Sequence, residues 1–155
     1  MKIKDSVFGE LEYDYVWSKD MQINFLGKEI GISFIVKGDE DGKFDNEQYV
    51  AYKLLMQNWE DVQRSLLQPI LDYYNQKRYE LGYDTSYNEN YPHIETTDQL
   101  VEMISMDGIV IPYGDIYEER DIGILFNCTW DIENGLGLRL LDEKVIEVGY
   151  QDVAI

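Results

Sequence analysis

Residues 45–81, DNEQYVAYKLLMQNWEDVQRSLLQPILDYYNQKRYEL, decide the fold, because apolar side chains recur in this stretch at steps of three and four. That period places them on one face of an α-helix. The apolar face is wide enough to predict helices that are largely buried. It consists of Tyr49, Tyr52, Leu55, Met56, Trp59, Val62, Leu66, Leu67, Ile70 and Tyr73.

Local signals set the limits of this helical block. Asp45 followed by Gln48 has the spacing of a capping box, in which the cap and the third helical residue exchange hydrogen bonds. Pro69 lacks an amide hydrogen and disfavours helical geometry in the residue before it. The sequence therefore predicts a helix over 45–67 and a second over 70–81, with a kink or a break between them.

On both sides of the helical block the apolar period is that of β-strands. Short β-rich runs interrupted by turn residues precede it, at residues 2–7, 11–17, 21–26 and 30–36. A short helix over 97–105, with Thr96 and Gln99 as a second capping box, follows it. Further strands are expected at residues 109–112, 122–129, 136–141 and 144–148.

Strands grouped on either side of a helical block are typical of the α+β class. We therefore expect one α+β domain over residues 1–155. Its mostly antiparallel sheet should have about eight strands, with a long kinked helix and a short helix packed on it.

Composition excludes some classes of partner. The 155 residues include 31 acidic and 13 basic side chains, which gives a formal net charge of -18. Nucleic acids and anionic membranes are bound mainly through Lys and Arg, so neither is expected as a partner. A basic protein suits this charge better.

Other features of the composition predict a soluble protein of the reducing cytoplasm. Cys128 is the single cysteine and cannot form an internal disulfide. The N-terminus lacks the pattern of a signal peptide, and no apolar run approaches the roughly 18 residues of a membrane helix.

Charge is distributed unevenly along the chain, since no Lys or Arg occurs between residues 79 and 119. This base-free stretch contains many acids, including Asp115, Glu118 and Glu119 near its end, interleaved with tyrosines. Tyrosine is favoured at interfaces, and carboxylates attract cationic partners. The expected partner-binding residues are Tyr79, Tyr83, Asp84, Tyr87, Glu89 and Tyr91. In the alternative interpretation the tyrosines pack onto the core and the acids only solubilise the loop.

A second candidate site is an acidic cluster near the C-terminus. Asp131 and Glu133 are two residues apart at the end of a strand and could act as general acid and base, and Asp152 could join them. This arrangement would suit a hydrolase. In a chain with 31 acids, however, two carboxylates in a hairpin are expected by chance, and a solvated turn accounts for them without catalysis.

No metal or cofactor is expected. His93 is the single histidine, which excludes multi-histidine metal sites. Residues 37–48 resemble a calcium loop only in being acidic, because Lys37 and Gln48 stand where an EF-hand needs Asp and Glu. Cys128 lies in an apolar run and should behave as a small buried hydrophobe.

The segment FNCTWDIENGLGL at residues 126–138, continued by VIEVG at 145–149 and Gln151-Asp152, resembles a bacterial family of small acidic proteins of unknown function. Members carry Trp-Asp-x-Glu-His-Gly-Leu-Gly at this point, and Asn134 replaces the histidine here. Some relatives accompany secreted bacterial toxins, so the resemblance implies an immunity-type inhibitor.

Three hypotheses follow from the sequence. The first is a binding protein that sequesters a basic partner, such as a toxin, through the base-free stretch. The second is a hydrolase that uses the carboxylates near residues 130–135. The third is a structural or interaction module without a catalytic site.

Overall fold

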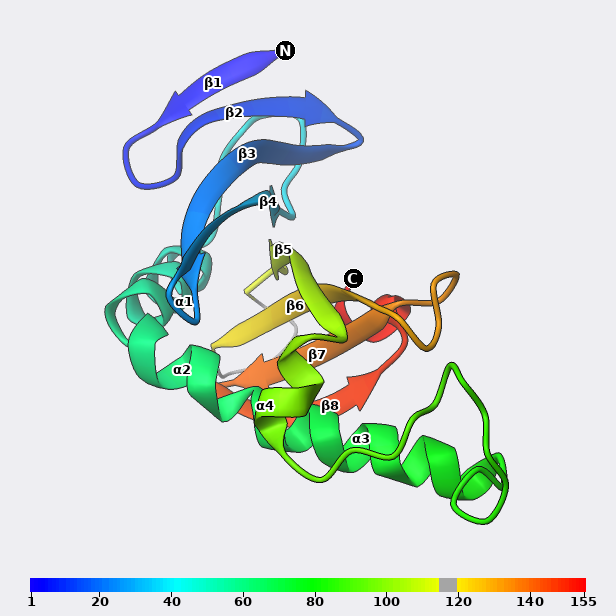
Figure 1. The fold of residues 1–155 in the computed structure, drawn as a ribbon. Coiled ribbons are helices and arrows are strands. Elements are labelled where there is room, and N and C mark those ends of the chain that lie inside the picture. The colour runs from blue at the N-terminus through cyan, green and yellow to red at the C-terminus, as the bar shows by residue number, and fades with distance from the viewer. Residues whose placement is uncertain (115–119) are drawn as a thin grey trace.

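A computed structural model describes residues 1–114 and 120–155. One eight-stranded sheet has its strands in the order of the chain, from β1 at one edge to β8 at the other (Figure 1). Every neighbouring pair is antiparallel except β4 and β5, which are parallel. The strands are β1 (Lys2–Asp5), β2 (Gly9–Asp14), β3 (Val16–Phe25), β4 (Lys28–Val36), β5 (Ile104–Ile111), β6 (Asp121–Cys128), β7 (Leu136–Leu141) and β8 (Lys144–Gly149).

The helices form the connection between the two parallel strands. A parallel pair needs a long crossover, because the chain must return to the end of the sheet from which the first strand started. The crossover holds α1 (Asn46–Gln57), α2 (Trp59–Ser65), α3 (Leu67–Glu80) and α4 (Thr97–Val101). The long bent helical block and the short helix pack on a mostly antiparallel sheet, which confirms the predicted α+β fold.

The core lies between the helices and one face of the sheet. Successive side chains of a strand point to opposite faces, so every second residue of a strand faces the helices. In β6 and β7 this set is Ile122, Ile124, Phe126, Leu136, Leu138 and Leu140, each at most 1 % exposed. The helices contribute Leu55, Leu66, Ile70 and Tyr74, all fully buried.

Gln48 fastens the start of α1 to the sheet. Its side-chain oxygen accepts a hydrogen bond from the amide of Asp45 at 2.9 Å, as the predicted capping box requires. Its Nε2 donates to the carbonyl of Lys37 at 2.8 Å, just beyond the end of β4. Burial of a side-chain amide costs little free energy when its oxygen and its nitrogen are both hydrogen-bonded, and the two bonds fix the position of α1 on the sheet.

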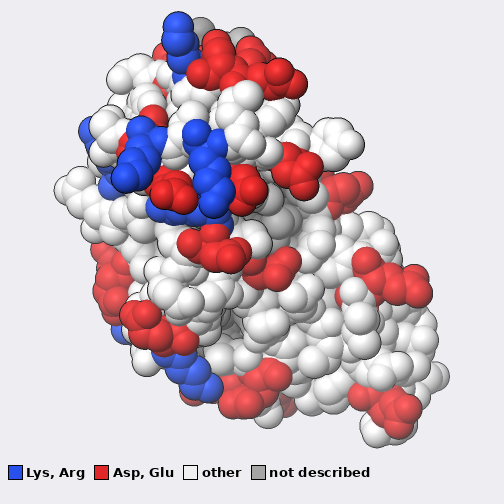
Figure 2. All heavy atoms as spheres, turned by 90° about the horizontal axis from the view of Figure 1, so that it is seen from above, with Lys and Arg blue, Asp and Glu red and all other residues white. Residues whose placement is uncertain are grey.

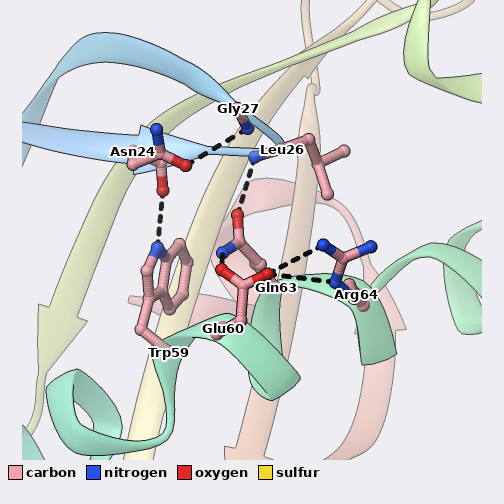
Figure 3. A network of polar contacts seen from close by, with 7 residues as sticks. All are labelled: Asn24, Leu26, Gly27, Trp59, Glu60, Gln63 and Arg64. Carbon is pink, nitrogen blue, oxygen red and sulfur yellow. Dashed lines mark hydrogen bonds and ion pairs between the residues drawn. The ribbon is translucent and has the colours of Figure 1, made fainter.

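Gln63 fastens α2 to the sheet in a similar way (Figure 3). Its Oε1 accepts from the amide of Leu26 at 2.6 Å, in the turn between β3 and β4. Its Nε2 donates to Glu60 at 3.0 Å, and Trp59 donates through Nε1 to the carbonyl of Asn24 at 2.6 Å. The polar side chains of α2 thus hold the tip of the β3–β4 hairpin.

The helical block is divided differently from the prediction. Asn58 ends α1, because its amide and its side chain both donate to the carbonyl of Leu54, at 3.0 and 2.9 Å. A second break falls at Leu66, three residues before Pro69. Pro69 therefore lies in the first turn of α3, where an amide has no partner within the helix and a proline is tolerated.

Three local features predicted from the sequence are wrong. The helix expected over 97–105 ends at Val101, and the strand expected at 109 begins at Ile104. Pairing between β5 and β6, which starts at Ile104 opposite Cys128, outweighs the helical period of this short segment. The turn expected at residues 18–20 is part of β3, and the chain reverses at Tyr15 instead.

None of the described helices combines the length and the apolar character needed to cross a lipid bilayer.

Candidate functional site

The segment after α3, residues 81–95, is called the acidic loop here, and one arginine holds it in place. Arg78, in the last turn of α3, donates through Nε to the carbonyl of Tyr91 at 3.0 Å and through Nη2 to the carbonyl of Tyr83 at 2.8 Å. Its Nη1 lies 3.4 Å from Nδ1 of His93. A single guanidinium thus ties both limbs of the loop to the helix, and its geometry suits several donors at fixed angles.

Two of the four regularly spaced tyrosines face the protein interior. The ring of Tyr91 stacks on buried Tyr74, with centroids 6.0 Å apart, and the ring of Tyr83 contacts Tyr91 at 5.1 Å. Tyr74 also packs edge-on against Trp130 at 4.8 Å and donates to the carbonyl of Pro92. Tyr83 and Tyr91 therefore anchor the loop, as the alternative interpretation of the sequence expects of packed tyrosines.

The other two tyrosines point into solvent. Tyr79 is 67 % exposed and Tyr87 is 89 % exposed. Asp84 and Glu89 are also exposed, and among residues 1–114 and 120–155 no ion pair involves either carboxylate. The predicted partner-binding set is thus divided into an inner pair of rings and an outer group of rings and charges.

Basic side chains are unevenly distributed on the face drawn in Figure 2. Most of the Lys and Arg lie at the upper left, beside acidic residues, and a few lie along the lower left, whereas Asp and Glu are spread over the whole face. Large parts of the face consequently carry negative charge without a neighbouring cation.

The predicted acidic cluster is a structured turn. The carboxylate of Asp131 accepts hydrogen bonds from the amide of Asn134 at 3.1 Å and from its side chain at 3.0 Å. Glu133 and Asp152 are exposed. A cavity of about 380 Å³ beside the turn is lined by Ile132 and by residues of β5 and β6, and not by these carboxylates.

Asp131 lies instead beside a group of tyrosines. The pKa of Tyr73 is raised to about 12, mainly by burial and then by the neighbouring Tyr150, Cys128, Asp131 and Tyr91. The pKa of Tyr91 is raised by burial and then by Asp131. The charge of Asp131 therefore acts on the phenols of both Tyr73 and Tyr91.

A lysine of the same chain lies over the rings of Tyr73 and Tyr150. The ammonium of Lys77 lies over the ring of Tyr73 at 5.8 Å and over the ring of Tyr150 at 5.1 Å from the centroids. Sequence reasoning missed Lys77 and Tyr150 as site residues. The spacing of four between Tyr73 and Lys77 on a helix is a signal that could have found the first contact, whereas nothing local points to Tyr150.

Cys128 is a buried thiol, as predicted. Burial raises its pKa to about 11, and its Sγ lies 3.5 Å from the carbonyl of Asp131. Since the thiolate is the nucleophilic form, this cysteine is unreactive near neutral pH.

Much of the C-terminal motif has an architectural role. A short 3₁₀ helix, η1 (Gln151–Ala154), lies against the sheet face opposite the helices, where a Cβ on Gly123 or Gly137 would come within 2.1 or 2.5 Å of a backbone oxygen. Gln151 donates through its amide to the carbonyl of Asn134 at 3.0 Å and through Nε2 to that of Phe126 at 2.9 Å. Gly123 and Gly137 therefore leave room for the C-terminal segment, and Gln151 holds this segment against the sheet.

Across the described part of the chain, no group of three or more His, Cys, Asp or Glu side chains is arranged to hold a metal ion. Asp115, Glu118 and Glu119, at the end of the base-free stretch, lie outside the described residues.

Comparison with known proteins gives a family but no characterised relative. No curated protein and no solved structure matches the chain. The model of one family, described as a domain of unknown function, matches residues 7–155, which is all of the described sheet except β1. This chain therefore belongs to the DUF6985 family.

Proposed function

We propose that this protein is a non-catalytic binding protein that captures a basic protein partner through the acidic loop. In this proposal Tyr79 and Tyr87 supply contact area, and Asp84 and Glu89 supply charge. The observation that carries the proposal is a group of exposed side chains on and beside a loop that Arg78 holds in place. The ring of Tyr87 in the loop and that of Tyr79 at the end of α3 are exposed, and the carboxylates of Asp84 and Glu89 form no ion pair within the described residues.

Physical reasoning supports a role in binding for this arrangement. A loop that is already ordered loses little conformational entropy when a partner docks. Tyrosine buries a large amphipathic surface with only two side-chain torsions to fix. The net charge of -18 attracts a cationic partner over distance and raises its association rate at low salt.

We further propose that the partner is a cationic toxin domain and that this protein is its immunity-type inhibitor. This step rests on the resemblance of residues 126–138 to a family with toxin-associated members. A toxin that acts on nucleic acid has a basic cleft for phosphates, which carboxylates can occupy in their place.

The hydrolase hypothesis gains no support from the geometry. The carboxylate of Asp131 is occupied by Asn134, and Glu133 stands exposed on the turn. A general acid or base needs a reacting group within hydrogen-bond reach in a site that can hold a substrate.

The test uses two triple variants with the same change in composition and charge. The loop variant carries Asp84→Ala, Tyr87→Ala and Glu89→Ala. The control carries Glu12→Ala, Asp14→Ala and Tyr15→Ala, at the exposed β2–β3 turn, where Tyr15 is 91 % exposed. The proposal predicts that a secreted polypeptide with a basic C-terminal domain is encoded beside this protein, and that domain is the partner to be measured.

Isothermal titration should show affinity lower by about 100-fold or more for the loop variant, since interface anchors commonly contribute 2 kcal/mol or more each. The control should lose only the general charge effect, about as much as a rise in salt produces. Equal losses in the two variants would reduce the proposal to non-specific attraction between opposite charges, and unchanged affinity in the loop variant would remove the loop from the interface.

A further inference from the structure

We infer that the strand gap, between residues 28–32 of β4 and 104–107 of β5, is a binding site for an extended peptide segment. The backbone of this segment pairs with the edge of β4, one apolar side chain enters the cavity beside that edge, and the basic side chains on either side of it face two carboxylates. The inference goes beyond the proposed function, because the strand gap lies outside the acidic loop and needs no folded partner.

The gap exists because the two central strands of the sheet pair over only half of their length. β4 has nine residues and β5 has eight, but the pairing joins only Ser33–Val36 to Gly108–Ile111. Asp107 is an extra residue between Met106 and Gly108, whose partners in β6 are adjacent. Such a β-bulge bends its strand and disrupts the ladder locally. Pairing with β4 therefore begins directly after the bulge.

Backbone groups of β4 point into the gap. The turn before β4 consists of residues 26–27, with φ of 53° and 89°, and the residues that flank such a two-residue turn exchange both hydrogen bonds. Bonding alternates along an antiparallel pair, so the amides and carbonyls of Glu29 and Gly31 point away from β3. The carbonyl oxygen of Ser33, the next residue in this series, indeed lies toward β5, 2.9 Å from the position of a Cβ on Gly108.

This edge is accessible. Gly31 has no side chain and is exposed, so its backbone can be reached from solvent although β4 is a central strand of the sheet. In the described part of the chain no strand pairs with β4 at this point on the β5 side. Glycine within a strand often marks the close approach of another backbone, and a row of unpaired amides and carbonyls recognises an extended chain.

A cavity of about 240 Å³ lies beside the edge. Its apolar lining consists of Phe25, Leu26, Ile30, Val101, Ile104 and Met106. A cavity of roughly 150 Å³ can hold benzene, so there is room for a leucine side chain. The cavity shares Leu26 and Val101 with a larger one of about 620 Å³, and Ile104 with the cavity of about 380 Å³ described above. A hollow that continues in this way suits a segment of chain better than a compact small molecule.

The wall of the cavity is held in place. The turn next to it is fixed by Gln63, which accepts from the amide of Leu26 at 2.6 Å, and by Trp59, which donates to the carbonyl of Asn24 at 2.6 Å (Figure 3). The ring of Phe25 contacts that of Phe126 in β6, with centroids 5.7 Å apart. A site that is already formed loses little conformational entropy when it is filled.

Charge identifies the occupant. Glu29 on β4 and Asp107 on β5 are exposed, and within the described residues neither forms an ion pair. One cation, Lys28, stands against them at the turn end of the cavity. Side chains of a strand alternate between faces, so the occupant carries an apolar residue between two basic ones. A second copy of this chain is disfavoured, because both copies carry a net charge of -18.

Hydrogen exchange, followed by NMR, tests the open edge without any ligand. In the free protein the amides of Glu29 and Gly31 should exchange about 100-fold faster or more than those of Ile30 and Ile32, which are bonded to β3. Equal protection of all four amides would overturn the inference, because the edge would then be covered. Protection of Glu29 and Gly31 that grows with protein concentration would also overturn it, in favour of a second copy.

The binding experiment uses the peptide acetyl-Thr-Lys-Leu-Lys-Thr-amide as the probe. At nine-tenths saturation the amides of Glu29 and Gly31 should exchange about ten-fold more slowly, since only the free protein exchanges at these positions. A peptide with serine in place of leucine has the same charge and should bind about ten-fold more weakly or worse, because it buries about three fewer apolar carbons. A peptide methylated at every backbone nitrogen keeps the side chains and should give no protection, because it cannot donate to the edge.

A matched pair of variants tests the two carboxylates. Glu29→Gln combined with Asp107→Asn should lower the affinity for the probe by about two- to ten-fold, the range for two exposed ion pairs. The control combines Glu12→Gln with Asp14→Asn at exposed positions of β2, which changes the net charge equally and should change the affinity little.

The inference is overturned if the probe leaves the exchange of Glu29 and Gly31 unchanged, if the serine or methylated peptide acts like the probe, or if the β2 control loses as much affinity as the gap variant. None of these results bears on the acidic loop, because the probe lacks the surface that Tyr87 and Asp84 are proposed to contact. Conversely, the loop variant should bind the probe as well as the β2 control does, even where it loses the basic partner. The two proposals therefore fail separately.

Discussion

Replacement of Arg78 by methionine should release the acidic loop and lower the free energy of unfolding by about 2 kcal/mol. Arg78 donates two hydrogen bonds to the carbonyls of Tyr91 and Tyr83, at 3.0 and 2.8 Å, and both are partly buried. A buried hydrogen bond from a charged group contributes about 1.5–3 kcal/mol. Partial exposure reduces this to about 1 kcal/mol each. Methionine keeps the packing of the alkyl part of the arginine side chain, so the change in the free energy of unfolding measures the loss of the guanidinium.

The matched control is Arg64→Met, which removes the same charge from an arginine that is 70 % exposed and pairs with Glu60 on its own helix. Such a pair contributes only about 0.3–0.5 kcal/mol. For a chain of this length we expect the melting temperature to fall by about 4–8 °C for Arg78→Met. The melting temperature of the control should fall by only about 1–2 °C, a quarter of the fall expected for Arg78→Met.

Hydrogen exchange should locate the effect of Arg78. Amides in residues 82–95 are expected to exchange faster in Arg78→Met, while those of β6 and β7 keep the protection of the core. If the two arginine variants melt together, or if exchange in the loop is unchanged, the loop is held by something other than this guanidinium and the account of the site is wrong.

Three further perturbations test the fold around the site. Gly137→Ala should lower the free energy of unfolding in urea by more than about 2 kcal/mol, because the added Cβ would lie 2.5 Å from a backbone oxygen. Gly31→Ala should have little effect, because the nearest atom to its Cβ is the movable end of a side chain at 3.2 Å. Gln63→Leu should cost about 1–3 kcal/mol, since it leaves the amide of Leu26 without its acceptor. The pKa of Tyr49 is raised to about 12 by burial and by its hydrogen bond to Asp5, so its contribution to stability is complete below pH 10 and is lost as the pH rises to 12. The urea midpoint of the wild type should therefore fall more steeply over this range than that of Tyr49→Phe.

The sequence predicted those parts of the fold that depend on neighbouring residues. The capping boxes at Asp45 and Thr96 form because each pairs a cap with a residue three positions later, and this geometry is local. The strands β6 and β7 were also predicted close to their observed bounds, because each is a short run rich in apolar residues. The break at Asn58 was not foreseen, because it depends on a side chain that competes for the carbonyl of Leu54.

The site was only half predictable for a related reason. A spacing of four places tyrosines on one side only if the chain is helical, and α3 ends at Glu80. Beyond that point the direction of each ring is set by distant contacts, with Tyr91 drawn inward by Tyr74 and Tyr87 left in solvent. No local pattern distinguishes these two tyrosines.

The placement of charge bears on which hypothesis is physically reasonable. The acidic loop contains three acids, Asp84, Glu89 and Glu95, and no Lys or Arg. Solubility alone gives no reason to place tyrosines as exposed as Tyr79 and Tyr87 beside these carboxylates. A cationic partner would pair with the carboxylates and cover the rings in one step, which is why we favour capture over a purely solubilising role. Binding measured at rising salt tests this reasoning directly, because screening should weaken capture by the wild type more than capture by the loop variant that lacks Asp84, Tyr87 and Glu89.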